Sequence, residues 1–205
     1  MADEPFDQIE ETLKKATAAL RAADVPFLLG GSLASWARGG PQTFKDLDFM
    51  IKPEDADRAL EALTKAGMRH EKPPEGWLYK AFDGDVMIDL IFRPRGLPMT
   101  DEVIERGDAM EVLALPIRVM ALEDVIATKL LSLDEHYLDY SGLLSMTRAL
   151  RELIDWDDVR ARTKESPYAK AFFTMVEELG IAPRPGEARA AEPVASQAQV
   201  RVVDD

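Results

Sequence analysis

The chain has 205 residues, of which 46% are hydrophobic and 31% are charged, a balance typical of one globular domain with a helical appendage. Its net charge of −13 argues against extended nucleic-acid binding, which depends on neutralising phosphates, although a local basic patch could still contact one RNA end. The acidity instead suits a cationic small molecule or a basic protein partner, unless it only aids solubility. Cys is absent and His occurs twice, which excludes disulfides, thiolate nucleophiles and a multi-histidine zinc centre.

The N-terminal residues lack the basic and apolar blocks of a signal peptide, and no apolar stretch approaches the length of a membrane span. We therefore expect a cytoplasmic protein without a membrane partner.

The pattern of residues 1–96 predicts an α/β (α+β) core with a short mixed sheet. Apolar residues at helical spacing from Phe6 to Leu20 indicate an N-terminal helix. The expected elements that follow are a strand at 25–30, a short helix at 31–40, a strand at 46–51, a helix at 53–67, and a hairpin formed by 77–82 and 86–92 around the turn Asp-Gly-Asp.

Residues 97–180 predict a mostly helical C-terminal region. Residues 110–120 could add one strand pair, with Pro116 as an edge or turn residue. Four helices are then expected, within 121–133, 139–153, 155–163 and 167–179. Residues 181–205 are rich in Ala, Pro and charge, which predicts a disordered tail.

Two carboxylates on the expected strand at 46–51 are the first chemical signal. Asp46 and Asp48 are two residues apart, so they project from the same face, and they would repel each other unless a proton or a cation lay between them. The preceding Gly30, Gly31 and Ser32 stand where a strand turns into a helix, so the backbone can approach an anion closely there. This combination suits a metal–triphosphate.

A third carboxylate, Asp89, lies among apolar neighbours in the expected strand at 86–92. An unpaired buried charge there would cost about 3–5 kcal/mol. If this strand lies beside the strand at 46–51, three carboxylates converge, and such oxygen clusters hold hard cations such as Mg²⁺. Two such ions can activate an attacking oxygen and stabilise a leaving pyrophosphate.

The order of these motifs resembles that of the DNA polymerase β-like nucleotidyltransferase superfamily. The resemblance covers residues 25–93 by motif: a strand-end Gly-Gly-Ser, then Asp46-Leu47-Asp48, then a later Asp89. It extends loosely to the helix bearing Lys129, whose Thr-Lys-Leu resembles that of bacterial members related to abortive-infection toxins. The sequence also resembles the small aminoglycoside nucleotidyltransferases.

The resemblance implies a short mixed sheet followed by a helical region, and it implies roles for individual residues. Gly30, Gly31 and Ser32 would cradle the β- and γ-phosphates of the nucleotide. The implied metal ligands are Asp46, Asp48 and Asp89, binding two Mg²⁺ ions that Mn²⁺ could replace. Asp89 could also accept the proton of the acceptor hydroxyl.

The resemblance extends to three further positions. Arg38 and Lys129 are implied phosphate contacts, although Arg38 could instead cap a helix and Lys129 could extend to solvent. Asp139 matches a downstream acid of the toxin-like members, with helix capping as the alternative. Related sequences carry Ser or Thr two residues before the first Asp, whereas this chain has Phe44 there and Thr43 one residue earlier.

Together these features predict a metal-dependent nucleotidyltransferase that moves a nucleoside monophosphate from an NTP, such as ATP, to an acceptor hydroxyl and releases pyrophosphate. A small-molecule acceptor is favoured over RNA because of the negative charge, and residues 134–139 could form an acidic and aromatic rim for a cationic acceptor. The alternatives are a toxin-like enzyme acting on tRNA, an enzyme acting on a protein side chain, and a catalytically silent nucleotide-binding module.

Overall fold

The structure is a computed structural model that describes residues 4–42 and 46–186. Thr43, Phe44 and residues 187–205 of the expected tail lie outside the described residues. The helices are α1 (Glu4–Ala22), α2 (Gly31–Trp36), α3 (Ala56–Lys65), α4 (Asp101–Glu105), α5 (Leu122–Ser132), α6 (Ser141–Leu150), α7 (Trp156–Thr163) and α8 (Pro167–Glu178). The strands are β1 (Phe27–Leu29), β2 (Asp46–Ile51), β3 (Arg69–Glu71), β4 (Leu78–Asp83), β5 (Val86–Ile91), β6 (Asp108–Val112) and β7 (Leu115–Val119).

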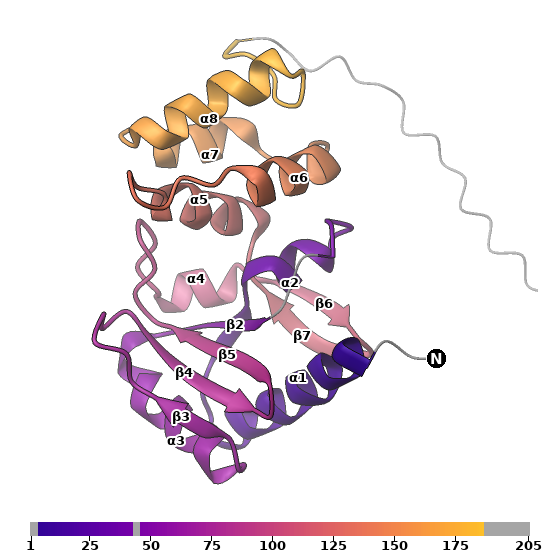
Figure 1. Ribbon diagram of the computed structural model, residues 1–205, viewed down its shortest axis with the longest axis vertical. Coiled ribbons are helices and arrows are strands. Elements are labelled where there is room, and N and C mark those ends of the chain that lie inside the picture. Colours follow the sequence, from indigo (N-terminus) through magenta and orange to yellow (C-terminus); the bar gives the residue numbers. More distant parts are fainter. Residues whose placement is uncertain (1–3, 43–45, 187–205) are drawn as a thin grey trace, which may run out of the picture.

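Within the described residues the strands form one seven-stranded mixed sheet in the order β3-β4-β5-β2-β1-β7-β6 (Figure 1). The pairings β2–β5 and β1–β7 are parallel, and the others are antiparallel. The expected mixed α/β fold is therefore confirmed, and the parallel β2–β5 pairing makes the two carboxylate-bearing strands neighbours.

The alternation of apolar and acidic residues in β2 separates the core from the functional face. Leu47 and Phe49 are fully buried, and the Phe49 ring packs edge-on against Phe27 at 5.4 Å between centroids. Helices α1 and α3 pack against each other and against β2, β4 and β5. Because alternate side chains of a strand leave opposite faces, Asp46 and Asp48 project away from Leu47 and Phe49.

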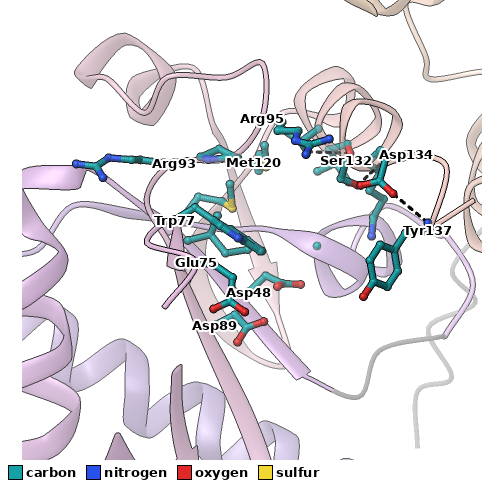
Figure 2. A pocket seen from close by; sticks show the side chains of 17 residues that line it. Asp48, Glu75, Trp77, Asp89, Arg93, Arg95, Met120, Ser132, Asp134 and Tyr137 are labelled. Atoms are coloured by element: carbon teal, nitrogen blue, oxygen red, sulfur yellow. Dashed lines mark hydrogen bonds between the residues drawn. The ribbon is translucent and has the colours of Figure 1, made fainter. Parts of the chain in front are cut away.

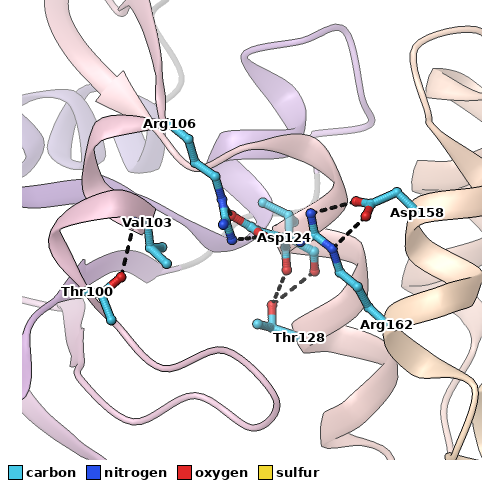
Figure 3. A network of polar contacts seen from close by, with 8 residues as sticks. Thr100, Val103, Arg106, Asp124, Thr128, Asp158 and Arg162 are labelled. Carbon is cyan, nitrogen blue, oxygen red and sulfur yellow. Dashed lines mark hydrogen bonds and ion pairs between the residues drawn. The ribbon is translucent and has the colours of Figure 1, made fainter.

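Helices α5 to α8 lie together beyond one side of the sheet (Figure 1), and α5 contacts α2, α6, α7 and α8. A buried carboxylate near the start of α5 connects these parts. Asp124 is fully buried and accepts two hydrogen bonds from Arg106, at 2.9 and 2.6 Å, and another from Arg162 of α7 (Figure 3). This cluster joins the segment between α4 and β6 to the helical region.

The structure differs from the sequence-based expectations in several local features. The helix expected from Pro53 begins as a 3₁₀ turn, Pro53–Asp55, before α3. The short elements β3 and α4 were not predicted; β3 is exposed and polar, so it has no apolar alternation to reveal it. The sheet also continues past residue 96, where the core was expected to end, because β7 pairs with β1.

Two further features concern the ends of the helical region and its strand pair. Residues 113 and 114 have positive φ, 51° and 56°, which forms the tight turn between β6 and β7 and places Pro116 inside β7. Ile181 and Ala182 are buried, so packing continues beyond residue 180. In the described part of the chain, no helix is long and apolar enough to cross a membrane.

Candidate active site

Two of the predicted carboxylates face each other across adjacent strands. In the parallel β2–β5 pairing, Asp48 lies directly opposite Asp89, whereas Asp46 lies opposite Met87. Side chains directly opposite on paired strands share one face of the sheet. The register therefore brings Asp48 and Asp89 together, with Asp46 two residues away along β2.

The turn from β1 into α2 passes directly beside Asp48. The Gly30 amide donates a hydrogen bond of 2.7 Å to the Asp48 carbonyl, and Gly31 has a φ of 59°. A Cβ atom at Gly31 would lie only 1.6 Å from Asp48 Oδ2. Glycine is required at position 31 for both its backbone conformation and the space that the carboxylate occupies.

Burial and neighbouring charges alter the protonation of Asp48. The residue is half-buried, and it lines the cavity beside Gly31. Desolvation by burial, followed by the charge of Asp46, raises the pKa of Asp48 to about 7, although Lys129 and Lys80 act in the opposite direction. Burial also raises the pKa of Asp89. Raised pKa values mean that the buried carboxylates favour the binding of a proton or a cation.

Lys80 of β4 is a cationic partner that the sequence did not single out. It lies directly opposite Asp89 in the antiparallel β4–β5 pairing, and its Nζ donates a 2.7 Å hydrogen bond to Asp89 Oδ1. A single lysine in a half-buried strand carries no signal of such a role, because only the strand register reveals its partner. The three side chains Lys80, Asp89 and Asp48 thus form a row across β4, β5 and β2.

Two members of this row, Asp48 and Asp89, line a cavity of about 720 Å³ (Figure 2), whereas Lys80 is not among its lining residues. The cavity lies between the sheet and α5, and Lys129 and Thr128 of α5 line it opposite the carboxylates. Its remaining charged lining residues are Glu75, Arg93, Arg95 and Asp134. The volume is sufficient for a nucleotide or a drug-sized ligand.

Aromatic side chains from two separate loops stand at the cavity mouth. Trp77 precedes β4 and is 41% exposed, and Tyr137 follows α5 and is 76% exposed. Asp134 Oδ1 accepts hydrogen bonds from the backbone amides of His136 and Tyr137, which fixes the turn that carries the Tyr137 ring (Figure 2). Exposed aromatic rings beside carboxylates can bind sugars, bases or cations.

The other predicted residues have different surroundings. Arg38 is not among the residues lining this cavity: its guanidinium donates hydrogen bonds to the carbonyls of Ala34 and Met120 and pairs with Asp108. Ser32 is half-buried in α2, beside Gly31. Asp139 accepts a hydrogen bond from the Ser141 amide at the start of α6, which is the capping alternative for this residue.

The acidic residues suit a divalent cation in their chemistry. Carboxylate oxygens are the ligands that hard cations prefer, and the raised pKa of Asp48 reflects the desolvation of its carboxyl, increased by the charge of Asp46. However, over residues 4–42 and 46–186, no three His, Cys, Asp or Glu side chains are grouped closely enough to hold a metal ion by themselves. A cation at Asp48 and Asp89 would therefore take further ligands from nucleotide phosphates or water.

A mixed sheet with paired acids on adjacent strands beside a glycine turn defines the nucleotidyltransferase class of fold. The chain matches the family described as "Uncharacterised nucleotidyltransferase" over residues 7–179, and it belongs to this family. It is therefore an enzyme of the nucleotidyltransferase class, and the resemblance seen in the sequence is confirmed. Among curated proteins, none matches the chain significantly.

Two solved structures share the fold. The chain is similar to the solution structure of the antibiotic-resistance factor ANT(2'')-Ia, with 18% identity, a TM-score of 0.59, and coverage of 83% of this chain and 96% of that one. It is also similar to the crystal structure of ANT(2'')-Ia in complex with adenylyl-2''-tobramycin, with 17% identity, a TM-score of 0.59, and coverage of 80% and 98%. At these identities the similarity establishes the fold alone.

Proposed function

We propose that this nucleotidyltransferase transfers a nucleoside monophosphate from an NTP to a hydroxyl of a small, cationic acceptor, with Asp48 and Asp89 at the reaction centre. The observation that carries the proposal is the row of Asp48 and Asp89 on the cavity floor, directly beside Gly31. An acceptor oxygen would form a bond to the α-phosphorus while the bond from that phosphorus to the pyrophosphate oxygen breaks. The acceptor proton would pass to Asp89 Oδ.

A divalent cation suits the chemistry of this site, and Asp48 and Asp89 would hold it together with nucleotide phosphates or water. The predicted ligand Asp46 lies opposite Met87 and, among the described residues, does not complete a group of three acidic side chains with them. When bound, Mg²⁺ or Mn²⁺ would neutralise charge on the phosphates and favour departure of pyrophosphate. In this proposal Gly31 lets the Asp48 carboxylate lie directly against the turn that leads into α2, since a Cβ at Gly31 would occupy the space of that carboxylate. Lys129, which lines the cavity from α5, would pair with the phosphates, as would Ser32 if the triphosphate reaches the start of α2. The predicted phosphate contact Gly30 already donates its amide to the Asp48 carbonyl.

The mouth of the cavity supports a small acceptor that carries positive charge. Glu75 and Asp134 line it together with the exposed rings of Trp77 and Tyr137. Carboxylates attract a cation, and aromatic faces bind both cations and sugar rings. The net charge of −13 would further favour the approach of a cationic molecule. A cytoplasmic location belongs to the same proposal, since that compartment supplies NTPs.

One observation favours a second candidate, transfer to an RNA end. Arg93 and Arg95 are exposed, and both line the same cavity as Lys129. Cations grouped at a cavity mouth can bind the phosphates of one RNA terminus even when the protein as a whole is acidic.

The two candidates are separated by following the transferred phosphate. The protein is incubated with Mg²⁺, each NTP labelled at the α-phosphate in turn, and a cell extract that is then separated into small molecules, RNA and protein. We expect the wild type to label the small-molecule fraction and to release one pyrophosphate for each labelled product. The Asp89→Asn variant should produce neither labelled product nor pyrophosphate. Label on RNA would replace the first candidate by the second, and label in no fraction with any NTP would contradict both.

A further inference from the structure

The carboxylate pair has a built-in counter-ion. Lys80 Nζ lies 2.7 Å from Asp89 Oδ1 and 3.3 Å from Met87 Sδ, and both contacts belong to residues of β5. The Lys80 side chain is 26% exposed and that of Asp89 is 12% exposed, so the ion pair is shielded from solvent. A shielded pair interacts more strongly than a surface pair because water screens it less.

The position of Lys80 differs from that of Lys129, the other cation near the acids. The strand register places Lys80, Asp89 and Asp48 side by side on one face of three neighbouring strands. Lys129 reaches the same cavity from α5 and its charge lowers the pKa of Asp48, whereas Lys80 is hydrogen-bonded to Asp89. Lys80 occupies an oxygen of Asp89 itself, which is an oxygen that a divalent cation would need.

We infer that Lys80 restrains the binding of divalent cations to the Asp48–Asp89 pair in the absence of nucleotide. It does so in two ways: it competes for Asp89 Oδ1, and its positive charge repels a second cation at short range. A nucleotide triphosphate would add negative charge to the site, so the cation and the nucleotide would bind most favourably together. This inference rests on the proposed function for the identity of the metal ligands.

The hairpin supplies a matched control. Lys15 of α1 pairs with Asp83 at the end of β4, with Nζ 2.6 Å from Oδ1, so it is also a lysine–aspartate pair that contacts this hairpin. Neither Lys15 nor Asp83 lines the cavity. Lys15→Met and Lys80→Met remove the same charge from the whole protein, but only Lys80→Met takes a partner from a carboxylate of the cavity; Asp83 keeps its hydrogen bond from Thr12.

The experiment measures Mn²⁺ binding without nucleotide, from the decrease in the electron paramagnetic resonance signal of free Mn²⁺. We expect Lys80→Met to bind Mn²⁺ at least about tenfold more tightly than the wild type, because a short-range cation repulsion is lost. Lys15→Met should stay within about twofold of the wild type, and Lys80→Arg within about threefold, since arginine keeps the charge. Thermal unfolding of each variant verifies that it is folded.

The outcomes separate this inference from the proposed function. The role of Lys80 would be overturned by any of three results. Folded Lys80→Met could bind Mn²⁺ no more tightly than the wild type, Lys15→Met could gain as much affinity as Lys80→Met, or no variant could bind Mn²⁺. Tighter binding by Lys80→Met that Asp48→Asn abolishes would support that role. Transfer of label is measured separately, so failure of transfer despite tighter Mn²⁺ binding would contradict the proposed function and leave the role of Lys80 intact.

Discussion

Asp48 and Asp89 lie directly opposite each other on the parallel strands β2 and β5, and each has a pKa above its ordinary value because it is buried. The two carboxylates therefore carry negative charge at positions where the protein shields them from water, which disfavours their ionised forms. The Lys80 ammonium compensates for the charge of Asp89, and a bound cation or a proton on Asp48 would compensate for the remainder. This relationship determines how the stability of the protein should respond to pH and to cations.

In metal-free buffer, the free energy of unfolding should fall as the pH rises from about 4 to 8. Asp48 has an ordinary pKa of 3.8 and one of about 7 in the folded chain, so between these values the folded state binds a proton that the unfolded state has lost. The stabilisation from this proton is complete below pH 3.8, decreases as the pH rises, and is lost once the pH passes 7. We expect a loss of roughly 2–4 kcal/mol from this group.

Chemical denaturation in EDTA at pH 5.5 and pH 8 measures this effect. Asp48→Asn should remove most of the decrease, because its amide does not titrate. Asp85→Asn, at an exposed position in the β4–β5 turn, should retain the wild-type pH dependence. Identical pH dependence of the wild type and Asp48→Asn would contradict the raised pKa.

Divalent cations should stabilise the protein more at pH 8 than at pH 5.5. A cation binds the ionised carboxylates, and at the lower pH it must displace the proton of Asp48. Thermal unfolding with and without millimolar Mn²⁺ gives the comparison, with Asp48→Asn as the variant expected to lose the shift. Equal stabilisation of the wild type at both pH values would argue against cation binding at this carboxylate.

Gly31→Ala should reduce both stability and transfer. The residue has a φ of 59°, and a Cβ would lie 1.6 Å from Asp48 Oδ2, so the carboxylate must move. Gly67→Ala is the control, because Gly67 also has a positive φ, 89°, but a Cβ there would meet no atom within 4 Å. We expect Gly67→Ala to cost about 1–2 kcal/mol through backbone strain alone, and Gly31→Ala to cost more. Urea unfolding that gave equal losses would contradict the close approach.

Asp124→Ala should be destabilising, by about 1.5–3 kcal/mol, because it removes the buried carboxylate that accepts hydrogen bonds from Arg106 and Arg162, while both guanidiniums keep access to solvent and Arg162 keeps its pair with Asp158. Asp157→Ala, on the exposed side of α7, should stay within about 0.5 kcal/mol of the wild type. Denaturation midpoints measure both changes. A neutral Asp124→Ala would mean that the cluster does not hold α5 and α7 to the sheet.

The sequence predicted what depends on periodicity and short motifs. Alternation in residues 46–51 gave the strand and the shared face of Asp46 and Asp48, and the apolar neighbours of Asp89 gave a second buried strand. The parallel pairing of these strands could only be stated as a condition. It depends on contacts between segments about forty residues apart, which local patterns do not encode.

The residues that the sequence missed share this dependence on distant contacts. Lys80 acquires a partner only through the β4–β5 register, and Asp124 is explained by arginines that precede and follow it by many residues. Glu75, Trp77 and Arg95 lie in loops, where no hydrophobic periodicity indicates which way a side chain points. The family resemblance implied that Arg38 contacts a phosphate, and only the structure reveals its hydrogen bonds to the carbonyls of Ala34 and Met120.

The decisive measurement is transfer of label from an α-labelled NTP to the acceptor fraction by the wild type, Asp48→Asn and Asp85→Asn, with folding verified by thermal unfolding. We expect the wild type and Asp85→Asn to transfer equally, and Asp48→Asn to lose at least about a thousandfold of the rate, because the loss of one ionised carboxylate removes much of the stabilisation of the transferring phosphate. A folded Asp48→Asn protein that retained full transfer would contradict a reaction centre at the Asp48–Asp89 pair.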